Sequence, residues 1–239
     1  MGARVPILTY HKIAPITKGT IYPGTFVPPN LFEKHLRLLN RRGFSSVRVA
    51  DLFADRMPGQ PILLTFDDGF QDFADNAWPL LQKHRFGALV FLVMNHLGGQ
   101  NEWDIAVGDK PAPLMNLETI HELVKQGAQF GSHTLSRPRL ANLDEQDQKR
   151  ELVESHNLLI SNLQPQTSHP TTICYPYGSY NAATLTLARE AGYKFGFSTD
   201  KGLNDASTDA MRLKRIAIRH DTSVPALIYK LWRGSRYDR

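Results

Sequence analysis

The sequence predicts an α/β fold, a distorted (β/α) barrel of about seven parallel strands. Strand-like apolar runs alternate with amphipathic helical segments along the 239 residues, and such alternation favours parallel strands with helices packed outside them. In addition, the polar residues with catalytic chemistry directly follow strand-like runs, and sites in barrels gather at the carboxyl ends of the strands. We therefore expect a single domain over residues 1–239, a length that suits one barrel.

The expected strands are runs rich in β-branched and aromatic residues. They are Val5–Tyr10, Ile62–Phe66, Ala88–Val93, Gln129–His133, Thr172–Tyr175, Lys194–Ser198 and Leu213–Ile218. Helices are expected where apolar residues recur at helical spacing between these strands. The clearest cases are residues 31–39, 117–124 and 152–160.

Two adjacent carboxylates are the strongest functional signal in the chain. The apolar run Ile62–Leu64 leads directly into Thr65-Phe66-Asp67-Asp68-Gly69. Burying two carboxylates at that point is costly unless a positive group, such as a metal ion, lies nearby. The same residues are also consistent with a plain turn, in which Asp caps a helix beginning near Gln71 and Gly69 adopts a positive φ.

Two further segments place polar or aromatic side chains after a strand. His133 follows the strand-like run Ala128–Ser132, although a lone His in a polar turn is most often an ordinary surface residue. Downstream, the β-branched run Thr171–Cys174 ends in the turn Tyr175-Pro176-Tyr177-Gly178, which places aromatic rings on a loop.

With Thr-Phe-Asp-Asp-Gly, Ser-His-Thr and Tyr-Pro-Tyr-Gly in this order, each after a strand, the chain resembles the NodB-homology polysaccharide deacetylase family (carbohydrate esterase family four). The opening Leu8–Ile13 is similar to members that act on β-linked N-acetylglucosamine polymers. The resemblance implies a hydrolase that uses a divalent metal, usually zinc, to remove acetyl groups from an N-acetylated polysaccharide or oligosaccharide.

The resemblance also implies roles for individual residues. Asp67 corresponds to the general base, and Asp68 and His133 correspond to metal ligands. The backbone N–H of Tyr177, after Pro176, is implied to help hold the oxyanion.

Three more residues are candidates for the active site, and each also has a non-catalytic interpretation. Tyr177 and Trp103 are candidate sugar-stacking rings, with packing as the alternative role. His220, at the end of the alternating run Arg215–Asp221, is the candidate general acid, and a solvated histidine beside Asp221 is the alternative.

Two positions depart from the family pattern. The second ligand histidine is expected at position 137, where this chain has Arg137. Arginine keeps its proton and has no lone pair to offer a metal. The arginine that usually begins the third motif and orients the base is replaced by Cys174. We therefore hypothesise that Arg137 pairs with Asp67, while water or another side chain completes the metal shell.

Composition narrows the possible partners and cellular locations of the protein. The net charge of +5 comes from scattered basic residues, so nucleic acid is not an expected partner. The lone Cys174 can form no internal disulfide. No run is apolar and long enough to span a bilayer, and the first expected strand begins at about Val5 without an apolar region of the kind found in signal peptides before it. The chain is therefore expected to act inside the cell, or outside it if an export segment is missing from this sequence.

Two functions of different classes remain open at this stage. The first is a metal-dependent deacetylase of N- or O-acetylated polysaccharide, with Arg137 as part of its catalytic site. The second is a family member that has lost its metal and binds glycan without turnover. A hydrolase of another small amide on the same scaffold is a third alternative, and the oligomeric state is left open.

Overall fold

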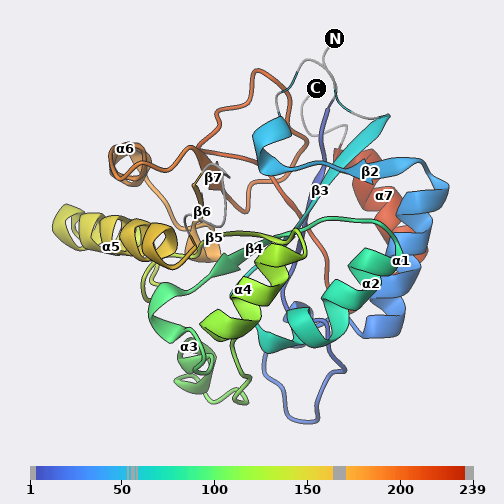
Figure 1. Ribbon diagram of the computed structural model, residues 1–239, viewed down its shortest axis with the longest axis horizontal. Helices are drawn as coiled ribbons and strands as arrows, with labels where there is room; N and C mark the ends of the chain where they lie inside the picture. The colour runs from blue at the N-terminus through green and yellow to red at the C-terminus, as the bar shows by residue number, and fades with distance from the viewer. Residues whose placement is uncertain (1–3, 53, 55–56, 58, 164–170, 235–239) are drawn as a thin grey trace.

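The computed structural model describes residues 4–52, 54, 57, 59–163 and 171–234, and a curved sheet of parallel strands forms its centre (Figure 1). The strand order is β7-β6-β5-β4-β3-β1-β8, and β2 pairs with β3 beside this path. All pairings between these strands are parallel. The expected distorted (β/α) barrel is confirmed, as a curled half-barrel with flanking helices.

Each expected strand is present. Strand β3 begins two residues earlier than expected, at Gln60, and the other expected strands are shorter than the sequence pattern indicated. The strands are β1 (Ile7–Tyr10), β2 (Phe44–Ser46), β3 (Gln60–Phe66), β4 (Leu89–Leu92), β5 (Gln129–Ser132), β6 (Thr172–Cys174), β7 (Phe195–Phe197) and β8 (Ile216–Ala217). The short β2 was not expected, because Phe44-Ser45-Ser46 has neither alternation nor β-branched residues.

The last expected strand is divided between the two edges of the sheet. Leu213 forms a parallel bridge with Phe197 of β7, whereas Ile216 in β8 pairs with Leu8 of β1. The segment therefore crosses the gap between the edge strands, and only Ile216–Ala217 remain as β8. Arg215 lies in the middle of this crossing.

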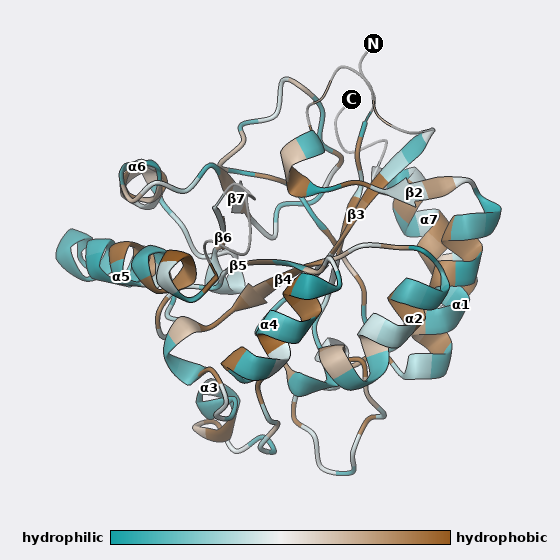
Figure 2. Ribbon diagram, in the orientation of Figure 1, coloured by the Kyte–Doolittle hydropathy of each residue, from teal (hydrophilic) through white to brown (hydrophobic). Residues whose placement is uncertain are grey.

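Helices pack outside the sheet, and Figure 2 shows hydrophobic residues along their sides. They are α1 (Pro29–Arg41), α2 (Trp78–Lys83), α3 (Glu102–Ile105), α4 (Leu117–Lys125), α5 (Glu145–Leu163), α6 (Ala182–Glu190) and α7 (Val224–Gly234). The three segments with expected helical spacing lie in α1, α4 and α5. No helix in the described part of the chain is both long enough and apolar enough to cross a membrane.

Alternation along the strands separates two apolar layers. On β3, Leu64 and Phe66 belong to the cluster between sheet and helices, while Leu63 belongs to the smaller cluster inside the barrel. Because side chains alternate faces along a strand, Thr65 and then Asp67 continue the inward row of Leu63. The sheet geometry therefore directs Asp67 into the barrel interior.

Candidate active site

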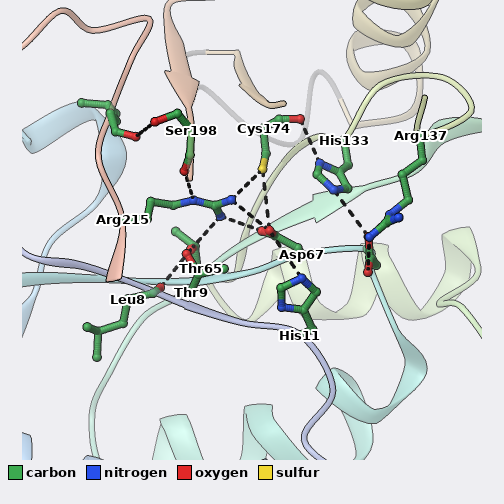
Figure 3. Close-up of polar contacts among 12 residues, drawn as sticks. Leu8, Thr9, His11, Thr65, Asp67, His133, Arg137, Cys174, Ser198 and Arg215 are labelled. Atoms are coloured by element: carbon green, nitrogen blue, oxygen red, sulfur yellow. Dashed lines mark hydrogen bonds and ion pairs between the residues drawn. The ribbon is translucent and has the colours of Figure 1, made fainter. Parts of the chain in front are cut away.

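A cavity of about 320 Å³ opens at the carboxyl ends of the strands. Its lining includes Asp67 after β3, His133 after β5, Tyr177 after β6, Arg215 before β8, and Arg137. Figure 3 shows Asp67 at the centre of a network of polar contacts that involves residues from several strands. These side chains meet because the strands are parallel, so their carboxyl ends lie at one edge of the barrel.

Asp67 is held as a buried carboxylate. It is 4% exposed and accepts two hydrogen bonds from Arg215, from Nη1 to Oδ1 at 2.7 Å and from Nη2 to Oδ2 at 3.0 Å. Burial by itself raises the pKa of Asp67, but the charge of Arg215, helped by His11 and His133, holds that pKa well below its usual range. Asp67 is therefore ionised near neutral pH.

Arg215 places a guanidinium against Asp67, where the family resemblance implies a contact from an arginine at position 174. The Arg215 side chain is 3% exposed, its Nε donates to the Ser198 carbonyl at 2.8 Å, and its Nη2 lies 3.0 Å from Cys174 Sγ. The small Cys174 side chain leaves room for the guanidinium of Arg215, which comes from the segment between β7 and β8. Sequence reasoning missed Arg215, although its inward position in the row Leu213-Arg215-Ala217 was an available signal.

The hypothesis that Arg137 pairs with Asp67 is wrong, because Arg137 pairs with Asp68. Arg137 Nε donates to Oδ1 of Asp68 at 2.5 Å and Nη2 donates to Oδ2 at 3.2 Å. Asp68 has a φ of 76°, so the chain leaves the extended conformation there, and Asp67 is already occupied by Arg215. Both carboxylates thus pair with arginines, while Gly69 adopts the positive φ expected of the turn.

Arg137 lies between two aromatic rings. Its guanidinium carbon is 4.8 Å from the centre of the Trp103 ring and 4.5 Å from that of Tyr177. Burial lowers the pKa of Arg137, but Asp68 outweighs this effect and raises it overall. Arg137 is therefore a permanent buried cation beside the cavity.

His133 is a neutral imidazole at the bottom of the site. It is 2% exposed, and its Nδ1 donates to the Cys174 carbonyl at 2.9 Å. This bond leaves Nε2 as the acceptor nitrogen, 3.5 Å from Asp68 Oδ1. Burial lowers the pKa of His133 to about 4, although Asp67 and Asp68 oppose the shift.

The structure does not bring His220 into the cavity. His220 is an exposed turn residue beyond β8 and is not among the described residues that line the cavity. His11 lines it instead, with Nε2 3.9 Å from Asp67 Oδ2. Sequence reasoning missed His11, yet it follows Thr9 on the inward row of β1, so the two-residue period could have indicated it.

The aromatic candidates occupy different positions. Tyr177 lines the cavity, is 44% exposed and has a φ of 59° in the turn after β6. Pro176 is buried within the same turn. Trp103 in α3 packs against Arg137 and is not among the described cavity-lining residues.

One group of described residues has ligand atoms close enough together to hold a metal ion. Such a group is of interest because the polysaccharide deacetylase family, which the sequence resembles, is generally metal-dependent. The group consists of Asp67, His133 and Cys174, whose ligand atoms lie within 4.8 Å of one another. Arg215 already donates to both Asp67 and the Cys174 sulfur, and burial raises the pKa of the thiol well above its usual value. A divalent cation held by this group would have to displace the Arg215 guanidinium from both Asp67 and Cys174, so the present side-chain arrangement does not fit a metal there.

The ligand pair implied by the sequence is also occupied. Both oxygens of Asp68 accept hydrogen bonds from Arg137, and His133 Nε2 faces the same carboxylate. A divalent cation placed there would meet the guanidinium charge at close range. The side-chain arrangement therefore does not fit a metal at Asp68 and His133.

An ionised carboxylate facing a cavity at the carboxyl edge of a parallel barrel lies where enzymes with such barrels place their active sites. The sequence profile of the family described as polysaccharide deacetylase matches residues 54–196. The match covers more than half of the chain, which therefore belongs to the polysaccharide deacetylase family of amide-bond hydrolases. The matched segment includes Asp67, Asp68, His133 and Arg137 and ends before Arg215.

Relatives with curated names agree with this family. The Bacillus subtilis protein YxkH, named for polysaccharide deacetylation, is 29% identical over 221 residues, 90% of this chain and 72% of that protein. Poly-beta-1,6-N-acetyl-D-glucosamine N-deacetylase of Staphylococcus aureus is 26% identical over 175 residues, 70% of this chain. The matched part spans 57% of the staphylococcal protein.

Solved structures show the same fold. The Streptococcus pyogenes deacetylase PplD, in complex with acetate, superposes with a TM-score of 0.81 at 26% identity and covers 96% of this chain and 99% of that chain. The fold also matches IcaB from Ammonifex degensii, with a TM-score of 0.76 at 22% identity, covering 98% of each chain.

Proposed function

We propose that this protein hydrolyses the acetamide of N-acetylglucosamine units in a polysaccharide, releasing acetate. The proposal is supported by the family and by the staphylococcal relative, whose name specifies poly-beta-1,6-N-acetyl-D-glucosamine. The observation that carries it is Asp67, an ionised carboxylate that Arg215 orients toward a cavity at the barrel mouth.

In the proposed reaction, water beside Asp67 attacks the acetyl carbonyl carbon and transfers a proton to the Asp67 carboxylate. The amide C–N bond then breaks, acetate leaves, and the sugar nitrogen takes up a proton to become an amine. We assign the donation of this second proton to His11 in its protonated form, because His11 lines the cavity and its Nε2 is 3.9 Å from Asp67 Oδ2. The neutral His11 then takes up the proton that Asp67 accepted from water, and the acetic acid formed leaves as acetate by releasing its carboxyl proton to solvent.

Charge stabilisation must contribute strongly to this reaction. The low pKa of Asp67 makes it a weak base, so stabilising the oxyanion is the more important source of rate. We propose that Arg137 and the backbone N–H of Tyr177 face this oxygen, and that a sugar ring packs on the exposed Tyr177 ring. Trp103 then supports Arg137 rather than the sugar.

The finer expectation of a zinc ion at Asp68 and His133 has less support, because Arg137 occupies the carboxylate. No step above depends on a metal. The same arrangement favours a second candidate, a family member that binds acetylated glycan without turnover.

Acetate release from poly-N-acetylglucosamine and from chitin oligomers separates the two candidates. We expect release by the parent protein and a decrease of roughly a hundredfold or more in Asp67→Asn, because the base is lost. Asp51→Asn is the matched control, since Asp51 pairs with Arg48 at the surface. Glycan binding without acetate release from the parent would favour the second candidate, and equal rates for parent and Asp67→Asn would assign the base elsewhere.

A further inference from the structure

We propose that the guanidinium of Arg137 replaces the divalent cation at Asp68 and His133, so that this family member carries a built-in cation and excludes metal from its site. The exclusion of metal follows from the geometry alone. Its catalytic consequence, deacetylation that needs no added metal, rests on the function proposed above.

The first argument is occupancy of the ligand atoms. Arg137 donates to both oxygens of Asp68, at 2.5 and 3.2 Å. The acceptor nitrogen of His133 lies 3.5 Å from the same carboxylate. The guanidinium therefore occupies the part of the site where an ion bound by Asp68 and His133 would have to lie.

The second argument is that Arg137 is held in place from several sides. It is 8% exposed and lies within 5 Å of the ring centres of Trp103 and Tyr177. Its backbone N–H donates to Thr134 Oγ1 at 3.0 Å, and its φ is 66°. A left-handed conformation is unfavourable for arginine, so tertiary contacts maintain this position and oppose movement of the cation away from Asp68.

The third argument is the position of the guanidinium charge at the cavity. Arg137 lines the cavity where the substrate is proposed to bind, and arginine keeps its proton in proteins. An acetyl oxygen that gains negative charge during water attack in this cavity would therefore lie beside a fixed positive charge. Arg137 would thereby stabilise the oxyanion, one of the tasks of a catalytic metal.

Metal content tests the proposal independently of activity. The parent protein, Arg137→His and Arg139→His are each incubated with zinc, desalted and analysed for bound metal. We expect no stoichiometric zinc in the parent and about one zinc per chain in Arg137→His, whose new imidazole would join Asp68 and His133 as ligands. Arg139→His is the matched control, because Arg139 lies on the same loop and contacts the Tyr177 ring. It should remain without zinc.

Acetate release with and without chelator tests the catalytic consequence. We expect the parent rate to be unchanged by chelator, whereas any activity of Arg137→His should depend on zinc. Stoichiometric zinc in the parent that Asp68→Ala removes would overturn the proposal, as would a parent rate abolished by chelator and restored by zinc. A parent without acetate release in any condition would refute the proposed function, while its zinc content would still decide the role of Arg137. The measurements on the parent protein test the proposal even if a variant fails to fold.

Discussion

Arg215 Nη2 lies 3.0 Å from the sulfur of Cys174 inside the barrel. The same nitrogen donates to Asp67, so the thiol and the carboxylate share one guanidinium. The sequence resemblance implies an arginine where this chain has Cys174, and here a guanidinium reaches Asp67 from the segment before β8. The proposed base is thus paired with a guanidinium from the segment before β8 instead of one from position 174.

Replacing Arg215 by Gln should lower both stability and acetate release. The change leaves the Asp67 charge buried without its cation, and breaking a buried pair costs about 3–5 kcal/mol. Urea unfolding would measure the loss of stability. Arg189→Gln is the control, since Arg189 pairs with Asp209 at the surface, and an exposed pair contributes about 0–1 kcal/mol. Equal losses in the two variants would show that Arg215 has no special role.

His11→Gln and His220→Gln should differ strongly in activity. His11 lines the cavity beside Asp67, whereas His220 is exposed outside it. Loss of a general acid typically lowers the rate by about 10²–10⁴-fold, so we expect such a decrease for His11→Gln and parent-like acetate release for His220→Gln. The reverse ranking would restore His220 as the acid.

The pH dependence of stability should report the buried His133. Its pKa falls from 6.5 to about 4 on folding because of burial, so between these values the unfolded chain binds more protons. Burial of a neutral His133 therefore contributes fully to the free energy of unfolding above pH 6.5. That contribution is lost as pH falls toward 4, and the total loss is at most about 3 kcal/mol.

The comparison of parent and His133→Asn isolates this contribution. Burial raises the pKa of Asp72 to about 6, and that shift changes stability in the opposite direction over much of the same range. Urea midpoints at pH 7, 6 and 5 should therefore show a difference between parent and His133→Asn that shrinks as pH falls. A difference that is constant over this range would contradict a buried neutral imidazole at position 133.

Local periodicity in the sequence was sufficient to predict the strands and the edge at which the site lies. The apolar run before Asp67 and the run before His133 determine two parallel strands, and the two-residue period then directs both side chains inward. The sequence also identified Arg137 and Cys174 as departures from the family pattern, because those positions could be compared residue by residue.

Only the tertiary structure decided which charges meet. Arg215 pairs with Asp67 across 148 residues and Arg137 pairs with Asp68 across 69, and no local pattern encodes such partners. The choice depends on the strand order, which brings the segment before β8 beside β1, and on the left-handed backbone at Asp68, where the chain leaves the extended strand. The tertiary structure likewise places His11 at the cavity and His220 outside it. Sequence periodicity determines the face of the sheet toward which a side chain points, whereas tertiary packing determines which residues it contacts there.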